Sequence, residues 1–427
     1  MTKEFEGKKL LILGGVRLAC DIVRRAQEMG AYVVVADYLE DSPAKKVADE
    51  GVLINALDVD AIVEYCKKAH IDGVTTGFVD ILLKPCYDVC QRLGLPCYMT
   101  PKMIEVSTNK VAFKEACLKY GVPVPQTYLL AGSIPEALYS KIHYPVFVKP
   151  LDASGSRGAG VCHNREELDK QFEEAVGDSV THNAIVEEYL TGREFLMNFI
   201  AQDGEFRMIS MFDRYVTDDR GSAINYASLS MGPSKAVDYY LSEINDKVVN
   251  MFRSLGFKDG IYFMQGYFDG HKITFYEMGC RLGGSYYDLE GCCINVDPIK
   301  MLVRYAFTGI MTENIESIPV NVGNYNNIAV CVNYLLDGKE GTIHKISGID
   351  EIKKIPSFVY ADQVHFEGYH YESDRIVDRP VLSVYLAVDD RLQLVRDVNF
   401  MNSIFKVEDS KGKSLLKEMF NPENLKI

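Results

Sequence analysis

The chain has 427 residues, of which 47% are hydrophobic and 25% charged, and a formal net charge of −14. This length allows two to four packed units with large cores, and the acidic balance argues against nucleic acid as a partner, because phosphate-backbone binding needs a broad basic surface. No apolar stretch approaches the ~20 residues of a membrane span, so we expect no membrane partner, and the charged first residues do not resemble a secretion signal, so we expect a cytoplasmic protein.

The first hundred residues alternate short apolar strands with helices. Strands are predicted at 9–13, 32–36, 51–54 and 73–76, and helices at 20–29 and 60–69. Repeated β-α-β units of this kind build a small parallel sheet with helices on both faces. The Gly14-Gly15 turn lacks a full GxGxxG pattern, so we interpret it as a tight strand-to-helix turn, with a dinucleotide-binding oxidoreductase as an alternative. Cys86 and Cys90 lie four residues apart without a His or a second cysteine pair, which favours core packing over a metal site.

The middle and the end of the chain mix strands and helices. A helix from Ser107 should end at Gly121, which places a domain boundary near residue 105. The Asp203-Gly204 and Asp269-Gly270 pairs predict hairpins, so an antiparallel sheet should follow the parallel one. Strands and turns resume after residue 311. The predicted fold is therefore a multidomain combination of α/β and α+β parts, with domains at 1–105, 106–310 and 311–427.

A charged residue and a glycine-rich segment follow one apolar strand. Lys149 ends the strand at 146–150, and residues 152–160 contain three glycines and two serines. Such a loop can point successive backbone N–H groups at an anion, while Arg157 adds a planar charge. Lys149 and this loop suit the β- and γ-phosphates of a nucleotide. Taken alone, the loop could equally be a surface loop after an edge strand.

A short acidic segment follows the next strand. Glu187, Glu188, Tyr189 and Leu190 form a hinge after the apolar residues 184–186. Its backbone groups could contact an adenine edge while a carboxylate accepts from the exocyclic amine. Glu194 is then placed to accept from ribose hydroxyls. Taken alone, two glutamates at this position are typical of the solvent-exposed end of a strand.

The Asp269-Gly270 hairpin carries a candidate metal site. Gln265 and Glu277 lie on its two strands, and both can face the same side of the sheet. One oxygen ligand from each strand suits Mg²⁺, which takes few protein oxygens and completes its shell with phosphate and water. Arg281 follows four residues after Glu277 and could neutralise the charge of a transferring phosphoryl group.

In this order the pieces resemble the ATP-grasp superfamily, over roughly residues 8–400. The nearest likeness is to the branch with biotin carboxylase, carbamoyl-phosphate synthetase and carboxylate–amine ligases. The resemblance implies a Rossmann-like N-terminal domain, two α+β subdomains at about 106–185 and 186–310 that clasp ATP, and a β-rich C-terminal cap. It also implies that ATP and Mg²⁺ are the cofactors.

The resemblance also assigns roles to individual residues. It makes Lys149, Arg157 and Arg281 catalytic, and Gln265 and Glu277 metal ligands. The residues that it assigns to ATP binding are Lys110, Lys149, Ser154, Gly155, Ser156, Arg157, Gly158, Glu187, Glu188, Tyr189, Leu190 and Glu194.

The metal strand departs from the family pattern. Most relatives read Glu-x-Asn-x-Arg there, whereas this chain has Glu277-Met-Gly279-Cys-Arg281. The third side-chain ligand is therefore missing. Water or phosphate oxygens could fill its position, Glu277 could bridge two ions, or the second metal could bind weakly.

The implied reaction activates a carboxylate as an acyl phosphate, which an amine then attacks, with release of ADP and phosphate. Both substrates would be small molecules, and Arg214, Ser285, Tyr286 and Asp288 are candidates to contact them, although structural roles fit these residues as well. Alternatives are a bicarbonate-activating enzyme like biotin carboxylase and a regulatory protein that binds ATP without turnover. A homodimer is the commonest assembly for enzymes of this size.

Overall fold

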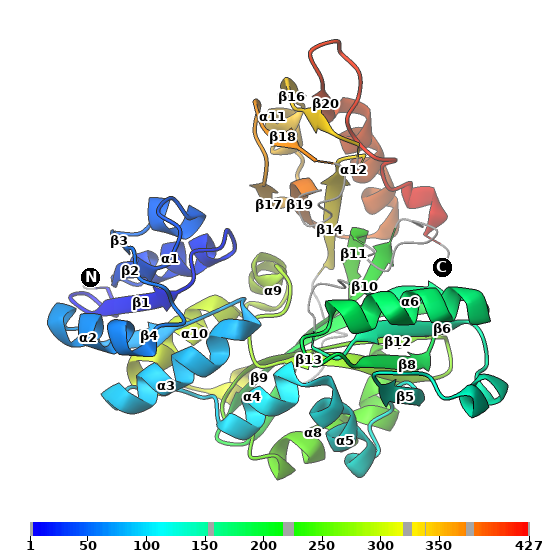
Figure 1. The fold of residues 1–427 in the computed structure, drawn as a ribbon. Helices are drawn as coiled ribbons and strands as arrows, with labels where there is room; N and C mark the ends of the chain where they lie inside the picture. The colour runs from blue at the N-terminus through cyan, green and yellow to red at the C-terminus, as the bar shows by residue number, and fades with distance from the viewer. Residues whose placement is uncertain are drawn as a thin grey trace.

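The computed structural model describes residues 3–152, 158–216, 226–318, 327–337, 339–372 and 380–425. Figure 1 shows the N-terminal sheet on one side, a larger central sheet beside it, a small helix-covered lobe at the other side, and the C-terminal residues above. This arrangement confirms the predicted multidomain class. Among the described residues, no helix has the length and apolar character needed to cross a membrane.

The N-terminal residues form the predicted parallel sheet, with strand order β3-β2-β1-β4. Its first two strands are almost wholly buried, as expected for a parallel sheet covered on both faces. Helix α1 packs with α10, and α2 packs with α3. The elements are β1 (Lys9–Leu13), α1 (Ala19–Glu28), β2 (Tyr32–Ala36), β3 (Glu50–Val52), α2 (Val59–Ala69), β4 (Gly73–Thr75), α3 (Leu83–Leu93) and α10 (Pro298–Thr308).

The space beside the Gly14-Gly15 turn is occupied by the side chains of Asp37 and Ser42. The Gly15 N–H donates to Asp37 Oδ2 at 2.6 Å, and a Cβ on Gly15 would lie only 2.1 Å from the Ser42 hydroxyl oxygen. These contacts support the interpretation as a tight turn. On α3, Cys86 and Cys90 are buried, and the part of the chain that the structure describes holds no group of three or more His, Cys, Asp or Glu that could bind a metal.

The helix predicted from Ser107 is wrong at its start. The structure has two helices, α4 (Pro101–Thr108) and α5 (Lys110–Tyr120). The Asn109 side chain accepts from the N–H groups of Val111 and Ala112, at 2.9 and 3.2 Å, and so caps a new helix. Lys110 is consequently the first residue of α5. The end is as predicted, with Gly121 in the left-handed region at φ +70°.

The small lobe is a four-stranded sheet with the order β5-β8-β6-β7, covered by α6. It has a core of its own, centred on Val146, Phe172 and Val186. Its elements are β5 (Thr127–Ala131), β6 (Val146–Pro150), β7 (Gly160–Cys162), α6 (Arg165–Asp178) and β8 (Ala184–Glu188).

The central sheet has eight strands in the order β13-β12-β9-β10-β11-β14-β19-β17. Both predicted hairpins are confirmed, because β9 pairs with β10 and β12 with β13 in antiparallel register. Its strands are β9 (Arg193–Gln202), β10 (Glu205–Val216), β11 (Ala227–Gly232), β12 (Gly260–Phe268), β13 (Ile273–Gly279), β14 (Ile328–Leu335), β17 (Phe358–Gln363) and β19 (Pro380–Val388).

The C-terminal residues are joined to this sheet, since β14 pairs directly with β11. A core of C-terminal side chains also includes Tyr215 and Leu229 from the central strands. The domain boundaries near 105 and 310 remain predictions. Further elements outside the two large sheets are α8 (Asn245–Ser254), α9 (Tyr287–Ile294), β15 (Gly341–Thr342), β16 (Lys345–Ser347), α11 (Ile349–Ile352), β18 (His370–Tyr371), α12 (Arg391–Ile404) and β20 (Lys406–Glu408).

Candidate active site

A buried carboxylate holds two lysines at the inner edge of the small lobe. Lys149, on β6, donates to Glu187 Oε1 at 2.5 Å, and Lys114, on α5, bonds the other oxygen. Only 4% of the Glu187 side chain is exposed. Burial raises the pKa of Glu187, but Lys149 and Lys114 outweigh it, so the pKa lies below its ordinary value.

A third lysine lies beside this pair. Lys110 is one helical turn before Lys114 on α5 and donates to the Leu151 carbonyl at 3.2 Å. Burial and the neighbouring Lys149 ammonium lower the pKa of Lys110. Lys110 also lies near the carboxylates of Glu277, Asp152 and Glu187, which oppose this lowering. Three lysines thus lie close together here, and such a cluster suits an anionic ligand. The sequence prediction missed Lys114, although its i,i+4 spacing from Lys110 was the available signal.

The predicted phosphate loop is described only at its two ends, because Ser154, Gly155, Ser156 and Arg157 lie outside the described residues. Asp152 accepts from the N–H groups of Val180 and Thr181, at 3.1 and 2.9 Å. Gly158 has a φ of +67°, and a Cβ there would lie 2.9 Å from the Pro150 side chain. Both ends are thus fixed next to Lys149.

The hinge after β8 differs from the prediction in one respect. Both Glu187 oxygens are engaged by lysines, so its carboxylate positions Lys149 instead of meeting an adenine amine. Glu188 donates its N–H to Gln126 O at 2.8 Å. Within the described chain, the N–H groups of Tyr189 and Leu190 have no acceptor, which leaves them as the donors that a nucleotide base could use.

Glu194 and Arg214, which were predicted to contact different ligands, contact each other. They are paired positions on β9 and β10, and Arg214 Nη1 donates to Glu194 Oε1 at 2.5 Å. The Tyr276 hydroxyl donates to the same oxygen at 2.6 Å. Burial opposes the charge on Arg214, but the Glu194 carboxylate holds its pKa above the ordinary value. A ligand that contacts either residue would therefore have to bind beside this ion pair or replace one of its partners.

The two predicted metal ligands lie side by side on the central sheet. Gln265 and Glu277 are directly paired on β12 and β13, so both side chains project from one face of the sheet. The Glu277 side chain is solvent-exposed, yet the surrounding protein desolvates it and raises its pKa, against the attraction of Arg281 and of Lys149 and Lys110. Exposure combined with desolvation is typical of a carboxylate on the wall of a cleft, here near Lys149 of the small lobe and Lys110 of α5.

Arg281 is held by a residue from the N-terminal part of the chain. Its Nε and Nη2 donate to the two oxygens of Asp80, at 2.6 and 2.9 Å. Its guanidinium carbon lies 4.7 Å from the centre of the Phe263 ring, a cation–π contact. The orientation of Arg281 is therefore fixed from two sides. Nothing local in the sequence connects Asp80 with Arg281.

The Phe263 ring fills the space beside Gly279. These two residues are paired on β12 and β13, and a Cβ on Gly279 would lie 2.1 Å from a ring carbon. A side chain at position 279 therefore has no room beside the ring unless the ring moves.

The candidate substrate residues after Gly284 are mostly occupied within the protein. The Tyr286 ring stacks on Phe212 at 4.3 Å, and its hydroxyl donates to Ser230 Oγ at 2.9 Å. The Ser285 and Tyr385 hydroxyl oxygens are 2.6 Å apart. Asp288 pairs with Arg25 of α1. Tyr286 in particular is a core residue, which corrects the expectation of a substrate contact.

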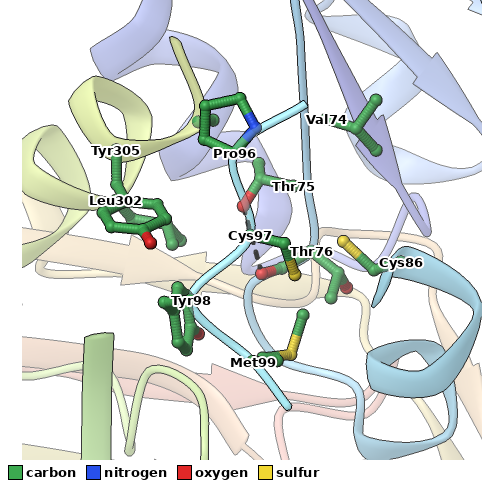
Figure 2. Close-up of a pocket in the computed structure, with 11 residues that line it drawn as sticks. Val74, Thr75, Thr76, Cys86, Pro96, Cys97, Tyr98, Met99, Leu302 and Tyr305 are labelled. Atoms are coloured by element: carbon green, nitrogen blue, oxygen red, sulfur yellow. Dashed lines mark hydrogen bonds between the residues drawn. The ribbon is translucent and has the colours of Figure 1, made fainter. Parts of the chain in front are cut away.

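Figure 2 shows a separate small pocket between the end of β4, residues 96–99 and α10. Cys86, Cys97, Tyr98 and Leu302 are among its mostly apolar lining. Its volume admits about one water molecule. None of the predicted site residues lines this pocket. They lie instead on the small lobe, on α5 and on the central sheet.

The chain is similar to known proteins over most of its length. Residues 109–287 match the family "Carbamoyl-phosphate synthase L chain, ATP binding domain". A formate-dependent phosphoribosylglycinamide formyltransferase from Sulfurisphaera tokodaii is 27% identical over 83% of this chain and 88% of that protein.

Solved structures share the fold over nearly the whole chain. An L-amino acid ligase from Bacillus licheniformis superposes with a TM-score of 0.77 and 18% identity, over 95% of this chain and 99% of the ligase. The biotin carboxylase domain of the Hydrogenobacter thermophilus 2-oxoglutarate carboxylase was solved with MgADP and bicarbonate. It superposes with a TM-score of 0.74 and 18% identity, over 96% of this chain and 91% of that domain.

Proposed function

This chain belongs to the ATP-grasp superfamily, and from that premise we propose that it is an ADP-forming carboxylate–amine ligase. It would activate a small-molecule carboxylate with ATP and join it to an amine. Relatives and structural neighbours whose names describe formyl transfer to an amine and the ligation of L-amino acids support this class. The cytoplasmic location and the homodimer remain proposals.

The opposition of Lys149 and Glu277 carries the proposal. The positive charges of Lys149 and Lys110 act on Glu277, so the lysines of β6 and α5 and the oxygen ligands of the central sheet border one site. The lysines suit phosphate oxygens, and the Gln265–Glu277 pair suits Mg²⁺. The residues present therefore fit a nucleotide and its metal.

The proposed reaction has two steps. A carboxylate oxygen of the substrate attacks the γ-phosphorus of ATP, the bond from that phosphorus to the ADP oxygen breaks, and an acyl phosphate forms. The amine nitrogen then attacks the acyl carbon, phosphate leaves with the electrons of the broken C–O bond, and the nitrogen loses a proton. Neither step needs a covalent bond to the protein.

The protein's part is alignment and charge neutralisation. Lys149, fixed by Glu187, and Lys110, at the start of α5, would hold phosphate oxygens. Arg281, fixed by Asp80, would face the phosphoryl group in transfer. Gln265 and Glu277 would hold Mg²⁺, which supplies further neutralisation of phosphate charge when bound.

The test is ADP release with Mg-ATP against amino acids and small carboxylic acids, alone and in pairs, with product masses read directly. Release that depends on a pair and yields a condensed mass supports the ligase. The Lys149→Met variant serves as the background control, because it should lack the nucleotide site.

Two other activities have distinct signatures in the same assay. The fold likeness to a biotin carboxylase domain makes bicarbonate activation the second candidate, and ADP release with bicarbonate alone would favour it. ATP binding without turnover across the whole panel would favour a regulatory protein. Either result would overturn the ligase proposal.

A further inference from the structure

The metal face of the central sheet has two adjacent layers. Gln265 and Glu277 form one pair of strand neighbours, and Phe263 and Gly279 form the next pair along the same two strands. Side chains two residues apart on a strand project from the same face. The layer beside the two oxygen ligands is therefore made of an aromatic ring and a glycine.

This second layer already carries a cation. The Arg281 guanidinium lies over the Phe263 ring, with 4.7 Å between its carbon and the ring centre. Asp80 holds it there with two hydrogen bonds, at 2.6 and 2.9 Å. Only 16% of the Arg281 side chain is exposed, so the charge is ordered and largely shielded from water.

The ring is there because two glycines leave space for it. A Cβ on Gly279 would lie 2.1 Å from a ring carbon, and a Cβ on Gly283 would lie 2.4 Å from Phe263 Cβ. Phe263 itself is 2% exposed. The packing thus excludes an oxygen-bearing side chain from the second layer.

We propose that this chain binds a single divalent cation with its nucleotide, through Gln265 and Glu277, and that Arg281 provides the positive charge in the neighbouring layer. The inference rests on the proposed function, because it presupposes a nucleotide between the two lobes. A second divalent ion would find no oxygen ligand on the Phe263–Gly279 pair, and the fixed positive charge of Arg281 would repel it.

Equilibrium dialysis tests the count directly, with Mn²⁺ in place of Mg²⁺ and a non-hydrolysable ATP analogue, on the full chain. Both bound Mn²⁺ and bound nucleotide are measured at saturation. We expect one Mn²⁺ per bound nucleotide. Two per nucleotide overturns the inference while leaving the ligase intact, whereas no bound nucleotide overturns the proposed function itself.

Asp80, which binds the Arg281 side chain, is the carboxylate that could compete as a metal ligand. In the Asp80→Asn variant we expect one Mn²⁺ per nucleotide, with an affinity for Mn²⁺ within about 2-fold of the parent. Loss of bound Mn²⁺ in this variant would make Asp80 a ligand and overturn the assignment.

A paired substitution tests the role of the ring. Phe263→Ala combined with Gly279→Asn removes the ring and supplies an amide oxygen in its place. We expect this variant to gain a second Mn²⁺ per nucleotide. If it folds and still binds one, the ring is not what excludes the second ion. If it does not fold, the parent and Asp80→Asn counts still decide the inference.

Discussion

The Lys149 ammonium lies 2.5 Å from Glu187 Oε1, while Lys114 takes the other oxygen of the same carboxylate. Glu187 thereby fixes Lys149 from the neighbouring strand, because β8 pairs directly with β6. Lys149, which the sequence predicted to bind phosphate, is thus positioned by Glu187, which the sequence predicted to lie near adenine.

Replacing Lys149 by Met should weaken nucleotide binding. The variant loses charge-assisted hydrogen bonds to phosphate, so the Kd for ATP should rise about 10- to 100-fold. Isothermal titration calorimetry measures it. Lys170→Met, at an exposed position of α6, is the control and should bind as the parent does. An unchanged Kd in Lys149→Met would refute the placement of the phosphates.

The Glu187→Gln variant should be less stable. It leaves two largely buried lysines without their carboxylate, which should lower the free energy of unfolding by about 3 kcal/mol. Because the folded-state pKa of Glu187 lies below the ordinary 4.5, the parent should keep this stabilisation above pH 4.5 and lose it on further acidification. Denaturant titrations between pH 3 and 7 measure both effects.

The matched control for Glu187→Gln is Glu136→Gln. Glu136 also pairs with a cation, Arg165, but its side chain is 78% exposed, so the change should cost much less stability than the change at Glu187. Equal losses in the two variants would mean that burial does not strengthen the dependence on Glu187.

Gly279→Ala should destabilise the protein. Its Cβ would meet the Phe263 ring at 2.1 Å, and displacing a buried ring typically costs about 1–3 kcal/mol. Gly177→Ala is the control, since α6 leaves open space around that position and alanine there should be neutral or stabilising by up to about 1 kcal/mol. Thermal unfolding of the two variants side by side gives the comparison. A Gly279→Ala protein as stable as the parent would contradict the packing argument.

Glu290, on α9, should make stability fall as pH rises. Burial raises its pKa to about 7, although Ser210 and Asn198 donate to it and oppose the shift, while Asp297 and Asp288 add to it. The folded protein therefore holds a proton that the unfolded chain releases near pH 4.5. Stability is fully present below pH 4.5 and is lost up to about pH 7, by about 3 kcal/mol in all.

Glu290→Gln should remove this pH dependence, because the amide is neutral throughout. The free energy of unfolding, measured at pH 5 and at pH 8, should differ less in the variant than in the parent. An equal difference in both proteins would show that other groups cause the pH dependence.

Local patterns predicted much of the fold and the pairing of the two proposed metal ligands. Alternating apolar runs located the parallel strands, and the Asp269-Gly270 turn set the register that pairs Gln265 with Glu277. Both are short-range features, in which turn chemistry and side-chain period determine the structure. The Asn109 cap was also visible in the sequence but was overlooked in favour of one longer helix.

The unpredicted contacts all join distant parts of the chain. Asp80 is far from Arg281 in the sequence, and Lys114 reaches Glu187 from another element. The filling of the Gly279 position by Phe263 depends on which residues face each other across a hairpin and on how a ring turns. Such contacts arise from tertiary packing, so residue spacing alone does not reveal them.

The pairing of β11 with β14 has a consequence for the behaviour of shortened chains. A chain ending at residue 310 would lack β14, β19 and β17 and would leave the β11 backbone as an unprotected edge. Open edges of this kind recruit strands from other molecules. The C-terminal residues thus also protect the central sheet from self-association. A chain without them should aggregate instead of forming a smaller folded protein.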